Sequence, residues 1–191
     1  MKTDSTQPPR LPSWVKVKLP GDGLYYAVRQ RLSKLHLHTV CEEARCPNVA
    51  ECWAGGTAAF MILGAVCTRG CRFCDVTSGR PAEPPDVGEP ARVAEAAALM
   101  GLKYVVVTSV DRDDLSDSGA HHFAHTVAAL REKIPEVVVE LLTPDFSGDA
   151  AAIAVVGRSG AEVLAHNLET TRRLTSVVRD RRCSYEASLD V

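Results

Sequence analysis

The sequence predicts an α/β fold in which helices cover a parallel β-sheet. Three observations support this fold class. Short apolar runs alternate with amphipathic helical patterns four times after residue 58. These runs are apolar almost throughout, as is typical of strands that are buried on both faces. Polar residues follow each run, at the point where the chain leaves the carboxyl end of a strand.

The segment before the first strand has a different character. Residues 1–23 are predicted to form an extended arm, because prolines and glycines interrupt any regular pattern. Residues 24–40 have the spacing of a helix, with apolar side chains three or four positions apart. We therefore predict two regions: residues 1–58, an N-terminal arm and cysteine-rich extension, and residues 59–191, the domain that holds the sheet.

The sheet domain is predicted to contain about four βα units. Tyr104–Val107 has the strongest strand pattern because it is aromatic and β-branched. Pro90 fits the first turn of the preceding helix, and Val93 and Met100 lie on one face of it. The predicted strands cover residues 60–63, 104–107, 137–142 and 162–166, and the predicted helices cover residues 89–102, 122–134, 149–158 and 170 onward.

Side chains suited to chemistry follow all four predicted strands. In parallel α/β folds the carboxyl ends of the strands meet at one edge, where active sites form. The sequence therefore predicts one site to which every strand contributes. The candidates are Cys67 after the first strand, Ser109 and Asp111 after the second, Thr143 to Asp145 after the third, and His166 and Asn167 after the fourth.

Composition narrows the class of protein. The chain has 191 residues, 46% of them hydrophobic and 24% charged, with a net charge of −2. These values are typical of a globular domain, and they give no electrostatic reason to expect nucleic acid or a membrane as a partner. No apolar run reaches the ~20 residues that a membrane span needs, and the first residues lack an apolar signal segment. The predicted location is the cytoplasm. In that compartment seven cysteines indicate metal binding or redox chemistry rather than disulfides.

Six of the cysteines form two compact sets. Cys67, Cys71 and Cys74 have the spacing C-x3-C-x2-C. Three thiolates on one tight loop can hold three irons of a [4Fe–4S] cube and leave the fourth iron open to another ligand. The other set has the spacing C-x4-C-x5-C and consists of Cys41, Cys46 and Cys52.

Zinc binding is the alternative interpretation of these cysteines. Structural zinc usually takes four ligands, often as two C-x2-C pairs, and only Cys71 and Cys74 form such a pair. His36 and His38 can complete a zinc site with Cys41, or they can be exposed helix residues. Three further histidines, His121, His122 and His125, are predicted to lie at the surface, and Cys183 is predicted to be a free cysteine near the start of a helix.

The C-x3-C-x2-C loop from Cys67 to Cys74 resembles the signature of the radical S-adenosylmethionine (SAM) superfamily. The combination with the upstream set is similar to the lipoyl synthase family, and the resemblance extends from about residue 24 to the end of the chain. The matching segments include Cys41–Asn48, Glu51–Trp53, Thr57–Gly64, Thr108–Leu115, Glu140–Phe146, His166–Thr170 and Tyr185–Leu189. The resemblance implies a partial (β/α) barrel of the radical SAM type.

It also implies an activity and its cofactors. Enzymes of this family insert two sulfur atoms at C6 and C8 of a protein-bound octanoyl-lysine, which becomes lipoyl-lysine. On this reading Cys67, Cys71 and Cys74 hold the catalytic cluster, to which S-adenosylmethionine binds, and Cys41, Cys46 and Cys52 hold a second [4Fe–4S] cluster that supplies the sulfur. The implied partners are octanoylated lipoyl domains of 2-oxoacid dehydrogenase complexes, glycine-cleavage H protein, and an electron donor such as ferredoxin or flavodoxin.

Five further residues are predicted to contact S-adenosylmethionine or the substrate. Phe73 matches the aromatic position of the radical SAM motif, which lies near the adenine. The other four, Ser109, Asp111, Glu140 and Asn167, lie in or after the predicted strands. The competing interpretation is that Ser, Asp and Asn at such positions cap the helices that follow.

The sequence departs from the family pattern at its end. The family's partial barrel has six strands and a C-terminal serine that ligates the second cluster, and this chain contains four predicted strands and no such serine motif. We therefore expect an exposed parallel sheet edge, and reduced or no activity for the 191-residue chain. Two other hypotheses are a sulfur-inserting enzyme resembling biotin synthase, which lacks the upstream cysteine set, and an inactive iron–sulfur or zinc module.

Overall fold

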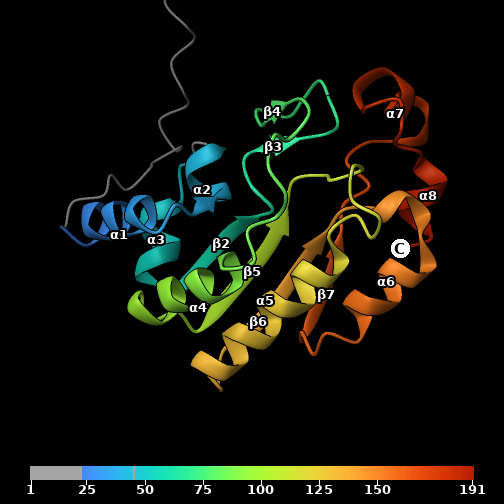
Figure 1. Ribbon diagram of the computed structural model, residues 1–191. Coiled ribbons are helices and arrows are strands. Elements are labelled where there is room, and N and C mark those ends of the chain that lie inside the picture. Colours follow the sequence, from blue (N-terminus) through green and yellow to red (C-terminus); the bar gives the residue numbers. More distant parts are fainter. Residues whose placement is uncertain (1–22, 45) are drawn as a thin grey trace, which may run out of the picture.

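The computed structural model describes residues 23–44 and 46–191, and it confirms the α/β class (Figure 1). The predicted arm of residues 1–23 lies almost wholly outside the described residues. At the centre is a five-stranded sheet with the order β1-β2-β5-β6-β7. The four predicted strands are present as a parallel array of β2 (Thr57–Ile62), β5 (Tyr104–Ser109), β6 (Val138–Thr143) and β7 (Val163–His166).

The sheet is open, as expected for a partial barrel. At one edge, β1 (His38–Thr39) pairs antiparallel with β2, a pairing that the sequence did not indicate. At the other edge, β7 has no strand beyond it among the described residues. Its side chains Val163 and Leu164 are 37% and 53% exposed. The predicted exposed parallel edge is therefore present.

Three helices follow the strands and cover one face of the sheet. They are α4 (Glu89–Leu99), α5 (Ala120–Lys133) and α6 (Ala150–Gly157) (Figure 1). The first ends three residues before its predicted end at residue 102. Gly101 adopts a left-handed conformation with φ of 63°, and the backbone N–H of Leu102 donates to the carbonyl of Ala97. Such a glycine satisfies the last carbonyls of a helix and ends it.

The N-terminal region forms short helices rather than one long helix. The predicted helix of residues 24–40 is shorter in the structure, as α1 (Gly23–Lys34), because His36 has a left-handed φ of 51°. The chain then enters β1, followed by α2 (Val40–Glu43) and α3 (Val49–Ala54).

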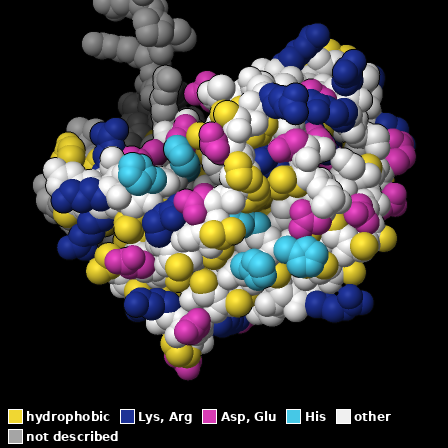
Figure 2. Space-filling view, viewed as in Figure 1, with side chains coloured by type: hydrophobic (Ala, Val, Ile, Leu, Met, Phe, Trp, Pro, Cys, Tyr) yellow, Lys and Arg dark blue, Asp and Glu magenta, His cyan; other side chains and the backbone are white. Residues whose placement is uncertain are grey.

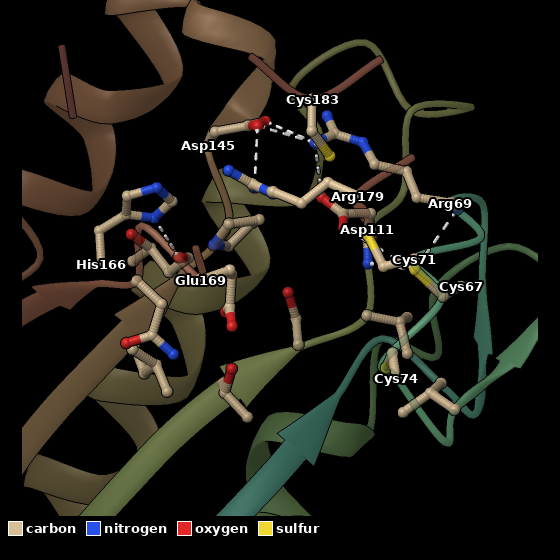
Figure 3. A pocket seen from close by; sticks show the side chains of 18 of the residues that line it. Cys67, Arg69, Cys71, Cys74, Asp111, Asp145, His166, Glu169, Arg179 and Cys183 are labelled. Atoms are coloured by element: carbon tan, nitrogen blue, oxygen red, sulfur yellow. Dashed lines mark hydrogen bonds and ion pairs between the residues drawn. The ribbon is translucent and has the colours of Figure 1, made fainter. Parts of the chain in front are cut away.

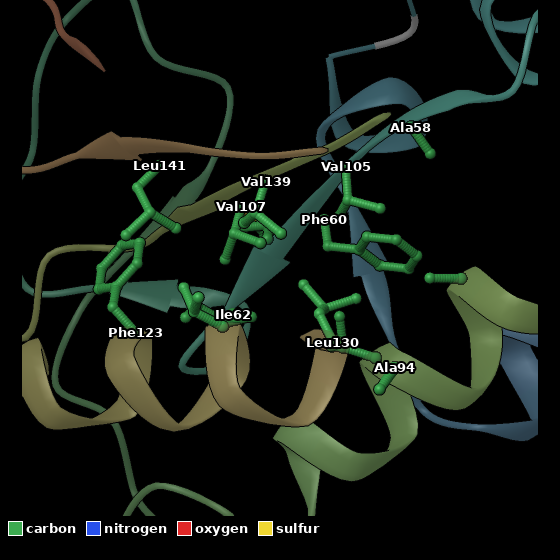
Figure 4. Packing of buried hydrophobic residues seen from close by; sticks show 14 of the residues in the cluster. Ala58, Phe60, Ile62, Ala94, Val105, Val107, Phe123, Leu130, Val139 and Leu141 are labelled. Carbon is green, nitrogen blue, oxygen red and sulfur yellow. The ribbon is translucent and has the colours of Figure 1, made fainter. Parts of the chain in front are cut away.

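The core lies between the sheet and helices α4 and α5 (Figure 4). Alternate residues of the strands point into it, among them Phe60, Ile62, Val105 and Val107, all of them fully buried. The N-terminal region shares this core through side chains of α1 and α3. These are Val28, Leu32 and Trp53.

One of the three histidines predicted to be exposed is buried. His121 and His125 are exposed, and Figure 2 shows histidines at the surface over α5. His122 is only 9% exposed, and its Nε2 lies 2.7 Å from Oε2 of Glu89, which is 5% exposed. The prediction was wrong for His122 because a polar partner on α4 meets it inside the protein.

After β7 the chain continues through two short helices, α7 (Arg172–Val178) and α8 (Tyr185–Leu189). α7 lies beyond the carboxyl edge of the sheet, and the C-terminus lies beside α6 (Figure 1). Within the described residues, none of the helices has the length and apolar character that crossing a bilayer requires.

Candidate active site

A pocket lies at the carboxyl edge of the sheet, where the sequence predicted a site (Figure 3). Loops after all four parallel strands line it, together with the segment that joins α7 to α8. Figure 3 shows Cys67, Cys71 and Cys74 on one side of the pocket and His166 and Glu169 on the opposite side. The remaining lining residues include Arg69, Phe73, Ser109, Asp111, Asp145, Asn167, Arg179 and Cys183.

The cysteine loop is anchored at its two ends by a small parallel sheet. Cys67 ends β3 (Val66–Cys67), which pairs with β4 (Thr77–Ser78) beyond the loop. Backbone N–H groups of Arg69 and Asp111 each donate to Cys67 Sγ at 3.4 Å. Burial raises the pKa of Cys67 to about 11, and the negative charge of Asp111 adds to the effect. The free thiol is therefore protonated at neutral pH, and a bound metal is what would favour its thiolate.

The three thiols suit an iron–sulfur cluster. All are free, and all line the same pocket. In the described part of the chain, no three His, Cys, Asp or Glu side chains converge on a single point as ligands of one metal ion do. A [4Fe–4S] cube makes a different demand, because each thiolate binds a separate iron. The donor set of soft thiolates on one loop therefore fits such a cluster.

A buried arginine ties the cysteine loop to the ends of β5 and β6. The side chain of Arg69 is only 2% exposed, and its guanidinium lies 2.7 Å from both Asp113 and Asp145 and 3.5 Å from Asp111. Burial raises the pKa of Asp111, although Arg69 acts in the opposite direction. Burial also acts to raise the pKa of Asp113, but hydrogen bonds from Arg69 and Thr68 outweigh it and lower the pKa. An unpaired charge at such depth is costly, so these ion pairs hold the loop in place.

Three buried polar atoms that line the pocket have no hydrogen-bond partner among residues 23–44 and 46–191. They are Ser109 Oγ, His166 Nε2 and Arg179 Nε. His166 Nδ1 lies 2.8 Å from the carbonyl oxygen of Thr143, so Nδ1 carries the proton and Nε2 of the neutral ring is an acceptor. The Arg179 side chain is 6% exposed, and its nearest carboxylate, Asp145, is 3.7 Å away. Buried polar groups are normally paired, so these atoms indicate a polar ligand.

Most of the predicted contact residues lie together. Phe73, Ser109, Asp111 and Asn167 all line the pocket. None of the last three caps a helix, because the N-cap residues of α5 and α7 are Gly119 and Thr171. The competing interpretation of these side chains as helix caps was therefore wrong.

Glu140 lies apart from the other predicted contact residues. It is in the middle of β6, where its carboxylate accepts a hydrogen bond of 2.6 Å from the hydroxyl of Tyr104, and it is not among the lining residues. Its predicted role stays a prediction.

Besides Arg69, sequence reasoning missed three polar side chains of the pocket that follow β7. Glu169 has a left-handed backbone with φ of 64°, which turns the chain after β7. Arg179 comes from the end of α7, and Cys183 lies one residue before Ser184, the N-cap of α8. Glu169 is only two positions from Asn167, which was a usable signal. Nothing in the sequence separates Arg179 from the other arginines nearby.

The second cysteine set lies on and between two short helices of the N-terminal region. Cys41 lies in α2, Cys46 follows it, and Cys52 lies in α3. The backbone N–H of Cys46 donates to the carbonyl of Cys41 at 3.0 Å. Burial raises the pKa of Cys52, and the neighbouring Cys41 and Cys46 add to the effect.

Comparison with known proteins defines the class of this protein. Residues 61–191 match the radical SAM superfamily, and residues 1–46 match the N-terminal domain of lipoyl synthase. The chain therefore belongs to the radical SAM superfamily, whose members bind a [4Fe–4S] cluster and S-adenosylmethionine.

The relatives narrow this to one family. The chain is 57% identical to the lipoyl synthase of Anaeromyxobacter sp. (strain Fw109-5) over 182 residues, which are 95% of this chain and 62% of the relative. It is 57% identical to the lipoyl synthase of Pyrobaculum calidifontis over 181 residues, again 95% and 62%. The mitochondrial lipoyl synthase of Arabidopsis thaliana is 54% identical over 185 residues, which are 94% of this chain and 50% of the relative. Within the superfamily the chain belongs to the lipoyl synthase family, and it spans 50–62% of the length of these relatives.

Proposed function

We propose that this protein is an enzyme with lipoyl synthase activity: it inserts sulfur at C6 and C8 of a protein-bound octanoyl-lysine to form lipoyl-lysine. The observation that carries the proposal is the pocket itself. Three free thiols on one loop share the pocket with buried polar atoms that have no hydrogen-bond partner in the described part of the chain. The identity to lipoyl synthases over 94–95% of the chain supports the choice of reaction.

Cys67, Cys71 and Cys74 are assigned to the catalytic cluster. When bound there, the cluster supplies one electron with which a carbon–sulfur bond of S-adenosylmethionine is broken. The protein's own part is to hold the thiolates, orient the nucleotide and keep water away from reactive carbon centres. Arg69 contributes by fixing the loop through its ion pairs with Asp113 and Asp145.

Arg179 is assigned to the carboxylate of S-adenosylmethionine. Its guanidinium is buried, it lines the pocket, and its Nε has no hydrogen-bond partner among the residues that the structure describes. Arginine binds carboxylates through charge-assisted hydrogen bonds. Glu169 lies across the pocket from the cysteines (Figure 3), and Asn167 lines the same pocket. They offer a carboxylate and an amide that suit the hydroxyl groups of a ribose. Phe73, which is 52% exposed, offers an aromatic face for the adenine.

Cys41, Cys46 and Cys52 are assigned to a second [4Fe–4S] cluster. The support is that all three are free cysteines and that their C-x4-C-x5-C segment resembles that of the lipoyl synthase family. The chemistry expected of this cluster is the supply of sulfur. In this proposal the region of residues 1–58 carries the sulfur source, and residues 59–191 carry the radical site.

Two kinds of partner are proposed. The substrate is carried by octanoylated lipoyl domains of 2-oxoacid dehydrogenase complexes and by glycine-cleavage H protein, and the electron comes from a donor such as ferredoxin or flavodoxin. Basic side chains gather on the surface around α7 (Figure 2), where the exposed arginines include Arg172, Arg173, Arg181 and Arg182. A positive surface beside the cysteine loop favours a donor with an acidic surface, because opposite charges steer association.

The test compares two triple variants with the unchanged protein. One replaces Cys67, Cys71 and Cys74 with alanine, and the other replaces the N-terminal set. After anaerobic reconstitution we expect about eight irons in the unchanged protein and about four in each variant, since each cube holds four. With a strong reductant and S-adenosylmethionine, 5′-deoxyadenosine should form only where the Cys67 set is intact. The carrier should gain the mass of two sulfur atoms only where both sets are intact.

Cys183→Ala is the matched control, because it removes a pocket thiol that belongs to neither set. It should keep about eight irons. The proposal is wrong if the unchanged protein takes up one or two zinc ions instead of iron, or if the variant without the Cys67 set still cleaves S-adenosylmethionine.

A further inference from the structure

The segment that joins α7 to α8 lies directly on the cysteine loop. The backbone N–H of Arg72 donates to the carbonyl of Val178 at 2.8 Å. The backbone N–H of Gly70 donates to Oδ2 of Asp180 at 2.9 Å, and the backbone N–H of Asp180 donates to Cys71 Sγ at 3.3 Å. Three consecutive loop residues are therefore contacted by a segment more than 100 positions away in the sequence.

Asp180 is itself held from the other side. Its Oδ1 accepts from Nε of Arg182 at 2.9 Å and from the backbone N–H of the same residue at 3.0 Å. Arg182 also forms an ion pair with Asp113, in which Nη1 lies 3.2 Å from Oδ2, and it donates a hydrogen bond to the carbonyl of Thr68. The Asp180 side chain is 14% exposed, so its carboxylate is largely shielded from water.

The hydrogen bond to Cys71 Sγ affects the reduction potential expected of a cluster bound there. Hydrogen bonds to the sulfurs of an iron–sulfur site are one of the means by which a protein sets the reduction potential. A donor beside a thiolate stabilises the reduced form more than the oxidised form, because the reduced form carries one more negative charge. The direction of a backbone N–H is fixed by the conformation of the backbone, so it depends on how the segment is anchored.

We propose that Asp180 is a positioning residue for the catalytic cluster. Its carboxylate accepts a hydrogen bond from the Gly70 N–H, and this contact orients the backbone N–H of Asp180 toward Cys71 Sγ. The hydrogen bond to the sulfur makes reduction of the cluster easier. This inference rests on the proposed function, in which Cys71 is a cluster ligand. It adds a role for a residue that is not among those lining the pocket.

Two variants separate this role from a simple loss of charge. Asp180→Asn and Asp180→Ala both remove the negative charge and the ion pair with Arg182. Only the asparagine keeps an oxygen that can accept the Gly70 N–H. Removal of a nearby negative charge by itself eases reduction, and it does so equally in both variants. Loss of the anchor makes reduction harder, and it does so in Asp180→Ala alone.

The measurement is an EPR-monitored redox titration in a protein whose N-terminal set, Cys41, Cys46 and Cys52, is replaced by alanine. We expect about four irons in each Asp180 variant. At the same applied potential, the ratio of reduced to oxidised cluster should be about tenfold lower in Asp180→Ala than in Asp180→Asn. For a one-electron couple this ratio corresponds to about 59 mV.

Equal potentials in the two variants, with iron retained, would overturn the inference and leave the proposed function intact. No uptake of iron by the parent protein would overturn the proposed function, and the inference with it. If Asp180→Ala fails to retain iron, Arg182→Lys replaces it. That variant keeps the charges of both residues and removes the Nε that donates to Asp180 Oδ1, so it must make reduction harder than in the parent, and an unchanged potential would refute the role of Asp180.

Discussion

Glu89 holds together the end of β2 and two helices, and its replacement is the most informative test of how the structure supports the site. Its Oε2 accepts a hydrogen bond of 2.8 Å from the backbone N–H of Leu63 and lies 2.7 Å from Nε2 of His122. Glu89 and His122 are 5% and 9% exposed. Leu63 directly follows β2 and leads into the loop that begins at Cys67.

The structure sets the expected magnitude. Glu89→Leu leaves two buried donors without an acceptor, each at a cost of about 1–3 kcal/mol. The free energy of unfolding should fall by about 2–6 kcal/mol, out of a typical total of about 5–15 kcal/mol. For a chain of this size, the melting temperature should fall by on the order of 10 °C. Glu89→Gln keeps an oxygen that accepts both hydrogen bonds, so it should cost less than half as much.

The assay is urea-induced unfolding of protein prepared without iron, followed by circular dichroism. Glu95 provides the matched control, since it lies on the same helix and is exposed. Glu95→Leu should change the free energy of unfolding by less than about 0.5 kcal/mol. Equal losses in Glu89→Leu and Glu95→Leu would refute the reasoning, as would a glutamine variant no more stable than the leucine variant.

Three further predictions follow from the structure. Gly119→Ala should destabilise the protein by about 1–3 kcal/mol in urea unfolding, because Gly119 has φ of 87° and an added Cβ would overlap Leu63 Cδ1. Arg179→Ala should raise the Kd for S-adenosylmethionine tenfold or more in the reconstituted protein, because it removes a buried charged hydrogen-bond donor. A hydrogen bond from Arg112 lowers the pKa of Asp114, so this ion pair stabilises the fold above about pH 4 and its contribution is lost as the pH falls further. Unfolding free energies at pH 3 to 7 should therefore show Asp114→Asn less stable than the unchanged protein at pH 7, with the gap closing toward pH 3.

Each of these has its own control or contrary result. Gly157→Ala has nothing within 4 Å of the added Cβ, so it should not destabilise the protein, and equal losses for Gly119 and Gly157 would contradict the argument. Arg179→Lys keeps the charge and should bind S-adenosylmethionine more tightly than Arg179→Ala. A gap between Asp114→Asn and the unchanged protein that stays constant down to pH 3 would show that the carboxylate is not what stabilises the pair.

The sequence by itself determined the parallel sheet and the main components of the site. Continuous apolar runs located all four parallel strands, because strands of parallel sheets carry near-continuous hydrophobic runs. In the structure only one face is fully buried, and alternate residues of β5 and β6 are half-buried. The spacing of Cys67, Cys71 and Cys74 indicated a tight loop that can hold a cluster. The rule that active sites form at carboxyl strand ends brought Ser109 and Asn167 to the same edge, and both line the pocket.

Only the tertiary structure decided which charged side chains meet. His122 falls in an ordinary helical pattern, and its burial depends on Glu89, 33 positions away on another helix. Arg69 looks like any loop arginine, but it joins carboxylates that follow two different strands. Asp180 reaches the cysteine loop across 110 positions. Periodicity reports which face of an element is apolar, whereas these contacts depend on how elements far apart in the chain are packed. No local pattern in the sequence records that packing.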